Sequence, residues 1–118
     1  MAAKDELGRR GEDAATAFLT RRGWTVLARN WRCPGGELDI VAVDGAELVV
    51  VEVKTRTSDR FGHPFEAVDA RKRARLWRLG LAWCAAHPEH ARGRRMRVDA
   101  VSLLGTDPFT LEHLRDLR

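Results

Sequence analysis

Two acidic residues and a lysine, in adjacent strand-like segments, are the strongest candidates for chemistry. Asp39 lies in one apolar segment and Glu52 in the next, and Lys54 follows Glu52 by two residues. Because side chains alternate along a strand, Glu52 and Lys54 share one face. Opposed carboxylates destabilise a sheet, and burying them is costly unless positive charge compensates. Carboxylate oxygens suit Mg²⁺ or Mn²⁺, so we expect a metal site; the alternative is a solvated strand end with a Glu–Lys ladder.

Whether Asp39 and Glu52 lie close together depends on the register of a predicted hairpin. Residues 37–43 and 47–55 are predicted strands on either side of Asp44-Gly45, a dipeptide favoured in tight turns. A two-residue loop would place Asp39 diagonally from Glu52, and a four-residue loop would place them directly opposite. A three-residue loop would put them on different faces, so the predicted site requires one of the other two registers.

The remaining elements indicate an α/β domain with a mixed sheet flanked by helices, in the order α-β-β-β-α-β. No repeat or linker divides the 118 residues, so we expect one domain over 1–118. The expected elements are a helix over 5–22, strands over 24–32, 37–43 and 47–55, a helix from about Glu66 to His87 ended by Pro88, a strand over 96–104, and residues 109–115, which fit either a strand or a short helix.

Lys72 interrupts the inward-facing stripe of the second predicted helix. The stripe consists of Val68, Lys72, Leu76, Leu79 and Trp83, at helical spacing. A lysine in such a position should point at an acid or a phosphate. The alternative is that its long side chain extends past the start of the helix into solvent.

Positive charge is concentrated in one part of the chain. The formal net charge is +4, but residues 71–97 contain nine basic side chains and one acid, Glu89, for a local charge of +8. Such a segment favours a polyanionic partner, although an arginine-rich composition alone could produce it. The candidates for phosphate contact are Arg71, Arg75 and Arg78 on a second face of the helix, and Arg56 just after the Glu52 strand.

Other classes of protein are disfavoured. No apolar run is long enough to span a membrane, and the first residues lack the apolar core of a signal peptide. Cys33 and Cys84 form no CxxC pattern, which disfavours a zinc site or a disulfide framework. We therefore expect a cytoplasmic protein. Neither a GxxxxGK[ST] nor a GxGxxG motif occurs, which argues against an ATPase or a dinucleotide-dependent enzyme.

The chain also resembles a known family through several short motifs. These are Gly11-Glu12, Arg29-Asn30, Gly36-Glu37-Leu38-Asp39, Val51-Glu52-Val53-Lys54-Thr55-Arg56, Phe61-Gly62, Lys72 and Arg97-Val98-Asp99. In this order they resemble the YraN-like family of small bacterial proteins, which is similar to the PD-(D/E)xK endonuclease-like superfamily and related in fold to archaeal Holliday-junction resolvases. The resemblance covers about residues 8–104.

The resemblance implies a restriction-endonuclease-like core and a role for each matched residue. Asp39 and Glu52 would bind the metal, and the Val53 carbonyl would add a ligand. Lys54 would orient or activate the attacking water and stabilise charge on the phosphate. Glu12 would match a catalytic glutamate of the first helix; the alternative is a surface acid.

The implied function is a metal-dependent nuclease acting on DNA rather than RNA, and relatives of this type work as homodimers. Glu37 shares the face of Asp39, and it is either a further metal ligand or a solvated acid at the start of its strand. The alternative function is a non-catalytic nucleic-acid-binding module of the same fold, in which the basic helix does the work. An adaptor without nucleic acid would require both charge clusters to be coincidental.

Overall fold

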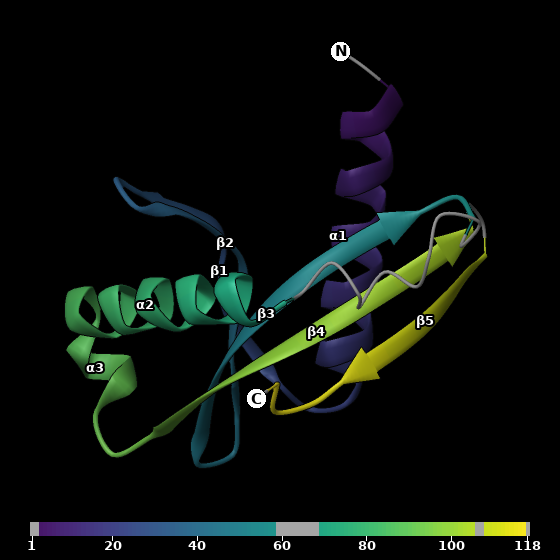
Figure 1. Cartoon of the computed structure of the whole chain (residues 1–118). Coiled ribbons are helices and arrows are strands. Elements are labelled where there is room, and N and C mark those ends of the chain that lie inside the picture. The colour runs from purple at the N-terminus through teal and green to yellow at the C-terminus, as the bar shows by residue number, and fades with distance from the viewer. Residues whose placement is uncertain (1–2, 59–68, 106–107, 118) are drawn as a thin grey trace.

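A computed structural model describes residues 3–58, 69–105 and 108–117 of the chain. Helices cover both faces of a five-stranded sheet (Figure 1). The elements are α1 (Ala3–Arg21), β1 (Thr25–Cys33), β2 (Gly36–Asp44), β3 (Glu47–Arg56), α2 (Ala70–Ala86), α3 (Pro88–Ala91), β4 (Arg95–Gly105) and β5 (Phe109–Leu114).

The sheet is mixed, and its strands lie in sequence order β1-β2-β3-β4-β5. All neighbours are antiparallel except β3 and β4, which run parallel. A parallel pair needs a crossover connection, and the segment that contains α2 and α3 provides it. The expected α/β architecture is therefore confirmed, and the arrangement is compatible with a restriction-endonuclease-like core.

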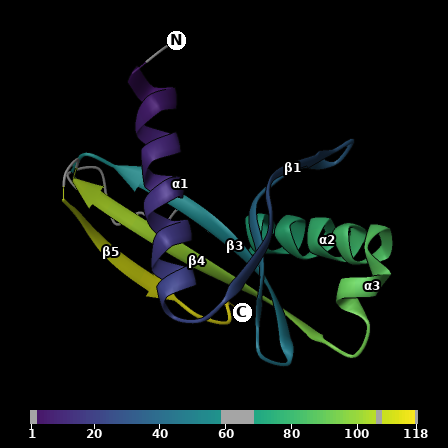
Figure 2. The same ribbon diagram turned by 180° about the vertical axis from the view of Figure 1, so that it is seen from behind.

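Each face of the sheet packs against one long helix, as the two opposite views show (Figure 1 and Figure 2). On the α1 face, Leu19 belongs to a buried cluster with Ile40 and Val51. On the α2 face, Leu76 and Trp83 belong to a second buried cluster that includes strand residues of opposite parity, such as Val50. Strands β2 and β3 are covered on both faces, which explains their nearly continuous apolar sequence.

The structure refines three of the predicted elements. The second helix begins at Ala70, after the Asp69 side chain accepts a hydrogen bond from the Lys72 N–H at 2.9 Å. Residues 66–68, which were expected to start this helix, lie outside the described residues. Pro88 does not only end α2; it begins α3, because proline suits the first turn of a helix. Residues 109–115, left open between strand and helix, contain β5.

A buried polar cluster joins β4 to its neighbouring strands on the α1 face. Asp99 is fully buried, and its carboxylate lies 2.9 Å from Arg97 Nε and 2.8 Å from His113 Nε2. Arg97 also contacts Glu47 at 2.6 Å. Burial would raise the pKa of Asp99, but hydrogen bonds from His113 and Arg97 outweigh it and leave that pKa below its ordinary value. Arg97 therefore does not add to the surface charge of residues 71–97.

Helix α1 approaches the sheet most closely at Gly11. A Cβ added at this glycine would lie 2.8 Å from Thr55 Cγ2 and 2.9 Å from Thr55 Cβ, which is too close for any side chain. Gly8, one turn earlier, has no such neighbour within 4 Å. The contact of Gly11 with β3 holds the next residue, Glu12, at the edge of the sheet. No helix in the described part of the chain is long and apolar enough to cross a membrane.

This contact makes a paired prediction about alanine substitutions in α1. Gly8→Ala should raise the free energy of unfolding by about 0.5–1 kcal/mol, because alanine favours helix over glycine. Gly11→Ala should lower it by about 1–3 kcal/mol, because the new methyl group pushes α1 away from Thr55. Urea unfolding measures both, and adding Thr55→Ala to Gly11→Ala should recover part of the loss. Equal stabilisation by the two glycine substitutions would contradict the close approach.

Candidate active site

The site forms where β2 separates from β3. The two strands pair from Asp44 and Glu47 as far as Ile40 and Val51. Beyond this point the Asp39 carboxylate takes the place of a strand partner and accepts the Val53 N–H through Oδ2, at 2.8 Å. We call this point the strand fork. Strand β1 contains a bulge between Val26 and Ala28, where it pairs with Ala42 and Val41 of β2.

The hairpin register brings Asp39 to Glu52. Val43 pairs with Leu48, which is the register that the four-residue loop predicts, and it places Asp39 opposite Glu52. The two side chains are hydrogen-bonded to each other. We call these two carboxyl groups the acid pair. The pair lies on the α2 face of the sheet, and Glu52 is 7% exposed.

Two lysines converge on Glu52 from different elements. Lys72 Nζ, from the first turn of α2, lies 2.7 Å from Glu52 Oε2. Lys54 Nζ, two residues along β3, lies 3.5 Å from the same oxygen. Lys72 therefore points at an acid, as its place in the apolar stripe of α2 predicts; Val68 of that stripe lies outside the described residues.

Burial and neighbouring charge move the four pKa values in different directions. Burial, and then the Glu52 charge, raise the pKa of Asp39 to about 8. Burial would also raise the pKa of Glu52, but hydrogen bonds with Asp39 and Lys72 outweigh it and lower that pKa. Burial and the adjacent Lys72 lower the pKa of Lys54, whereas Glu52, against the effect of burial, raises the pKa of Lys72. At neutral pH the acid pair thus keeps one proton, on Asp39.

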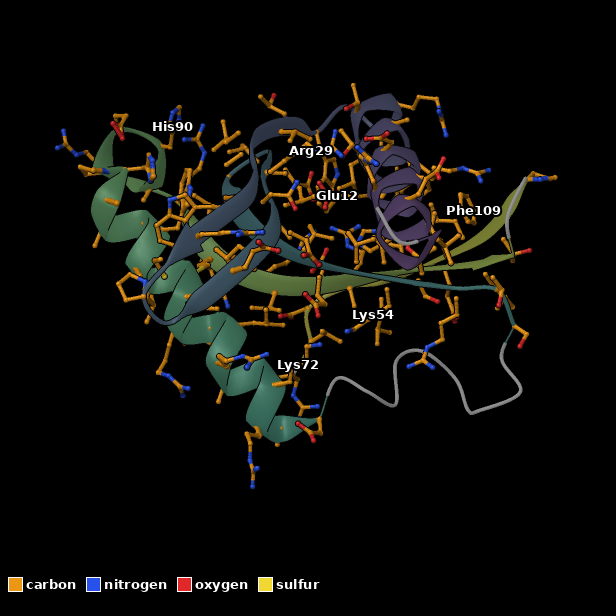
Figure 3. All side chains as sticks on the ribbon, turned by 90° about the horizontal axis from the view of Figure 1, so that it is seen from above. Glu12, Arg29, Lys54, Lys72, His90 and Phe109 are labelled. Carbon is orange, nitrogen blue, oxygen red and sulfur yellow. The ribbon has the colours of Figure 1, made fainter. Side chains whose placement is uncertain are left out.

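Glu12 reaches the same region from the other side of the sheet. It is 8% exposed, and its Oε1 atom accepts hydrogen bonds from Arg29 Nε and Asn30 Nδ2, each at 2.9 Å. Asn30 has a φ of +53°, a left-handed conformation that asparagine tolerates better than most residues. Figure 3 shows Glu12 beside Arg29, with Lys54 and Lys72 farther toward α2. The sequence showed Arg29-Asn30 only as a motif, and the structure shows that it holds Glu12.

A cavity of about 560 Å³ opens on this region between α1 and the β1–β2 hairpin. Its lining includes Glu12, Asn30, Glu37, Asp39, Val53 and Thr55. The Glu37 carboxylate lies 2.6 Å from Arg32 Nε, so the sequence-predicted ligand Glu37 has an arginine partner. The Val53 N–H points to Asp39, and because both polar groups of a strand residue face the same edge, its carbonyl faces the fork too.

The acid pair has the chemistry that a divalent cation requires. Two carboxyl groups in contact repel each other when both are ionised, and this repulsion adds to the effect of burial in raising the pKa of Asp39. Oxygen ligands of this kind suit Mg²⁺ or Mn²⁺. Among the described residues, however, no three His, Cys, Asp or Glu side chains gather closely enough to hold a metal. A cation here would therefore depend on the acid pair together with backbone or water oxygens.

The predicted phosphate-binding arginines lie outside this cluster. Arg71, Arg75 and Arg78 are exposed on the outer side of α2. Arg56 is half-buried at the end of β3, where it pairs with Leu104 of β4. None of the four belongs to the acid pair itself, but Arg75 lies near enough to Lys72 for its charge to act against the raised pKa of that lysine.

The raised pKa of Asp39 predicts how Asp39→Asn changes stability with pH. The Asp39 carboxyl group of the wild type binds a proton more tightly in the folded than in the unfolded protein. The stability that this protonation contributes is fully present below pH 3.8 and is lost as the pH rises through about 8. An asparagine stays neutral, can accept the Val53 N–H and can donate to Glu52. Asp39→Asn should therefore raise the free energy of unfolding by about 1–2 kcal/mol at pH 8, and have little effect near pH 4.

Urea unfolding at the two pH values measures this effect. Glu89→Gln, at an exposed carboxylate on α3, is the control and should change stability by less than about 0.5 kcal/mol. An Asp39→Asn protein less stable than wild type at pH 8 would contradict the shared proton.

Comparison with known proteins places the chain in a family. The model described as "Uncharacterised protein family UPF0102" matches residues 11–103. A UPF0102 protein of Paenarthrobacter aurescens is 56% identical over 117 residues, which cover 98% of this chain and 95% of the relative. The UPF0102 proteins of Arthrobacter sp. (strain FB24) and Frankia alni are 53% and 50% identical, and each match covers 98% of this chain and 98% or 96% of the relative. The chain belongs to the family UPF0102.

Proposed function

We propose that the protein is a divalent-metal-dependent nuclease that hydrolyses phosphodiester bonds in DNA. The observation that carries the proposal is the acid pair at the strand fork, with two lysines on Glu52 and a raised pKa on Asp39. Perturbed carboxyl groups beside a polar cavity are typical of functional sites. The resemblance to the YraN-like family and to the PD-(D/E)xK superfamily supports the same assignment.

Asp39 and Glu52 would hold the cation, with the Val53 carbonyl and Glu37 as further candidate ligands. When bound, Mg²⁺ or Mn²⁺ supplies the positive charge that polarises the phosphodiester and stabilises the leaving oxygen. Asp39 must lose its proton to become a ligand, so the site works best when the pH approaches or exceeds about 8.

The two lysines have different roles. Lys72 contacts Glu52 at 2.7 Å and keeps that carboxylate ionised and oriented. Lys54 is the looser contact, at 3.5 Å, and its pKa is lowered by burial and by Lys72. Lys54 is therefore the group better suited to take a proton from an attacking water, or to donate to a phosphate oxygen. Glu12, fixed by Arg29 and Asn30, lines the same cavity as Asp39.

One observation favours the second candidate, a non-catalytic nucleic-acid-binding module. The Lys72 ammonium already neutralises Glu52, which is part of what a cation would do. In that case the acid pair and Lys72 are fold determinants, and the exposed arginines of α2 carry the binding. Such a module binds DNA with a strong dependence on salt and leaves it intact.

Replacing Glu52 separates the two functions. With Mn²⁺ or Mg²⁺, wild type should cut labelled DNA from a panel of junction, flap, single-stranded and duplex substrates. Glu52→Gln should cut more than about a hundredfold more slowly, because it removes a metal-binding charge. Glu89→Gln, the same change at an exposed site on α3, should cut like wild type.

Controls with EDTA and circular dichroism exclude a contaminant and a folding defect. Cleavage that is equal in wild type and Glu52→Gln would contradict the proposal. If no protein cuts and all three shift DNA in a salt-dependent way, the binding module becomes the assignment.

A further inference from the structure

The outer side of α2 exposes two large apolar side chains. Trp77 is 44% exposed and Leu81 is 50% exposed, and their spacing of four residues places them on one side of the helix. By contrast, Trp24 and Trp83 are buried, at 6% and 1%. An exposed tryptophan beside an exposed leucine is therefore not explained by core packing.

These two side chains border a shallow groove of about 590 Å³ between α2 and the start of β4. We call it the α2 groove. Arg94, Arg95 and Met96 form part of its wall, and one acid, Asp116, borders it. Arg94 donates one N–H to the His90 carbonyl at 2.7 Å, which holds its guanidinium at this edge. The groove thus combines an aromatic face with cationic groups.

A stripe of arginines connects this groove with the candidate active site. Arg71, Arg75 and Arg78 recur at helical spacing and are exposed. Going around the helix from Lys72, the order is Arg75, then Arg78, then Leu81 and Trp77, in steps of roughly 40–60°. Along the axis, Trp77 is only about 7.5 Å from Lys72, because each residue of a helix rises about 1.5 Å. The stripe therefore begins beside the acid pair and ends at the groove.

Cationic side chains beside an aromatic face match the chemistry of a nucleic acid strand. Arginines bind the phosphates, and a tryptophan stacks on a base. In a duplex the base faces are covered by their neighbours, whereas an unpaired strand can turn a base onto a side chain. We propose that the α2 groove binds single-stranded DNA, with one base stacked on Trp77 and the adjoining phosphates on Arg94 and Arg95, which line the groove with it. The choice of DNA as the polymer rests on the proposed function.

In the proposed complex, the strand crosses the arginine stripe and reaches the acid pair from the α2 side. The nuclease would then select substrates that have an unpaired segment within a few nucleotides of the cut. The phosphates of a fully paired duplex could bind the arginines, but its bases are stacked on one another and could not stack on Trp77. The groove therefore acts as a specificity determinant for the shape of the substrate.

Fluorescence anisotropy with the metal-free protein in EDTA tests this binding without turnover. The labelled probes are an oligo(dT), an abasic oligonucleotide of the same length, a duplex and an oligo(rU). Wild type should bind the oligo(dT) about tenfold more tightly than the abasic strand. Trp77→Ala should remove most of that difference, and Trp77→Phe, which keeps an aromatic ring, should retain much of it. Leu114→Ala, at an equally exposed apolar residue on β5, should bind like wild type.

Three results would overturn the proposal. The first is equal binding of the oligo(dT) by wild type and Trp77→Ala. The second is tighter Trp77-dependent binding of the oligo(rU) than of the oligo(dT), which would make RNA the ligand. The third is a wild-type dimer in sedimentation that Trp77→Ala dissociates while oligo(dT) binding is unchanged, which would make a second copy the occupant.

The test is separable from the test of the nuclease. The binding assay contains EDTA and the cleavage assay contains a metal ion, so either one can fail while the other succeeds. Trp77-dependent binding without any metal-dependent cleavage would contradict the nuclease and support the groove. Metal-dependent cleavage without Trp77-dependent binding would support the nuclease and contradict the groove.

Discussion

The burial of two carboxyl groups in contact is the constraint on which the rest of the structure depends. The hairpin register places Asp39 opposite Glu52, and because β2 leaves β3 at this point, the Asp39 carboxylate accepts the Val53 N–H at 2.8 Å. Glu52 requires a cation on its other side, and Lys72, at 2.7 Å, provides it. That contact joins the first turn of α2 to β3. The crossover helix is therefore held to the sheet at the same place where β2 separates from β3.

The two buried acid clusters of the protein show what is particular about this site. Asp99 is surrounded by Arg97 and His113, which keep it ionised, and it joins β4 to its neighbours. Asp39 faces another carboxyl group instead, and its pKa is raised to about 8. The first arrangement stabilises the fold, whereas the second one lowers stability at neutral pH. A protein retains such an arrangement where function requires it, which is the pattern expected of a ligand site.

Sequence periodicity predicted the parts of the site that depend on local structure. Alternation along β3 put Glu52 and Lys54 on one face, and helical spacing pointed Lys72 at an acid. The parts that depend on tertiary contacts were not predictable in this way. The hairpin register was open between alternatives, because both satisfied the hydrophobic pattern. The support of Glu12 by Asn30 requires a left-handed residue in β1, and the ion pairs of Arg97 require strands that are far apart in sequence.

The exchange of a proton for a cation at the acid pair is the central claim, and calorimetry tests it most directly. Titration of the metal-free protein with Mn²⁺, in buffers of different ionisation enthalpy, counts the protons released on binding. At pH 7, below the pKa of about 8 for Asp39, we expect the release of about one proton per bound ion, falling toward zero above about pH 9. Binding without proton release at pH 7, or no binding at all, would contradict it.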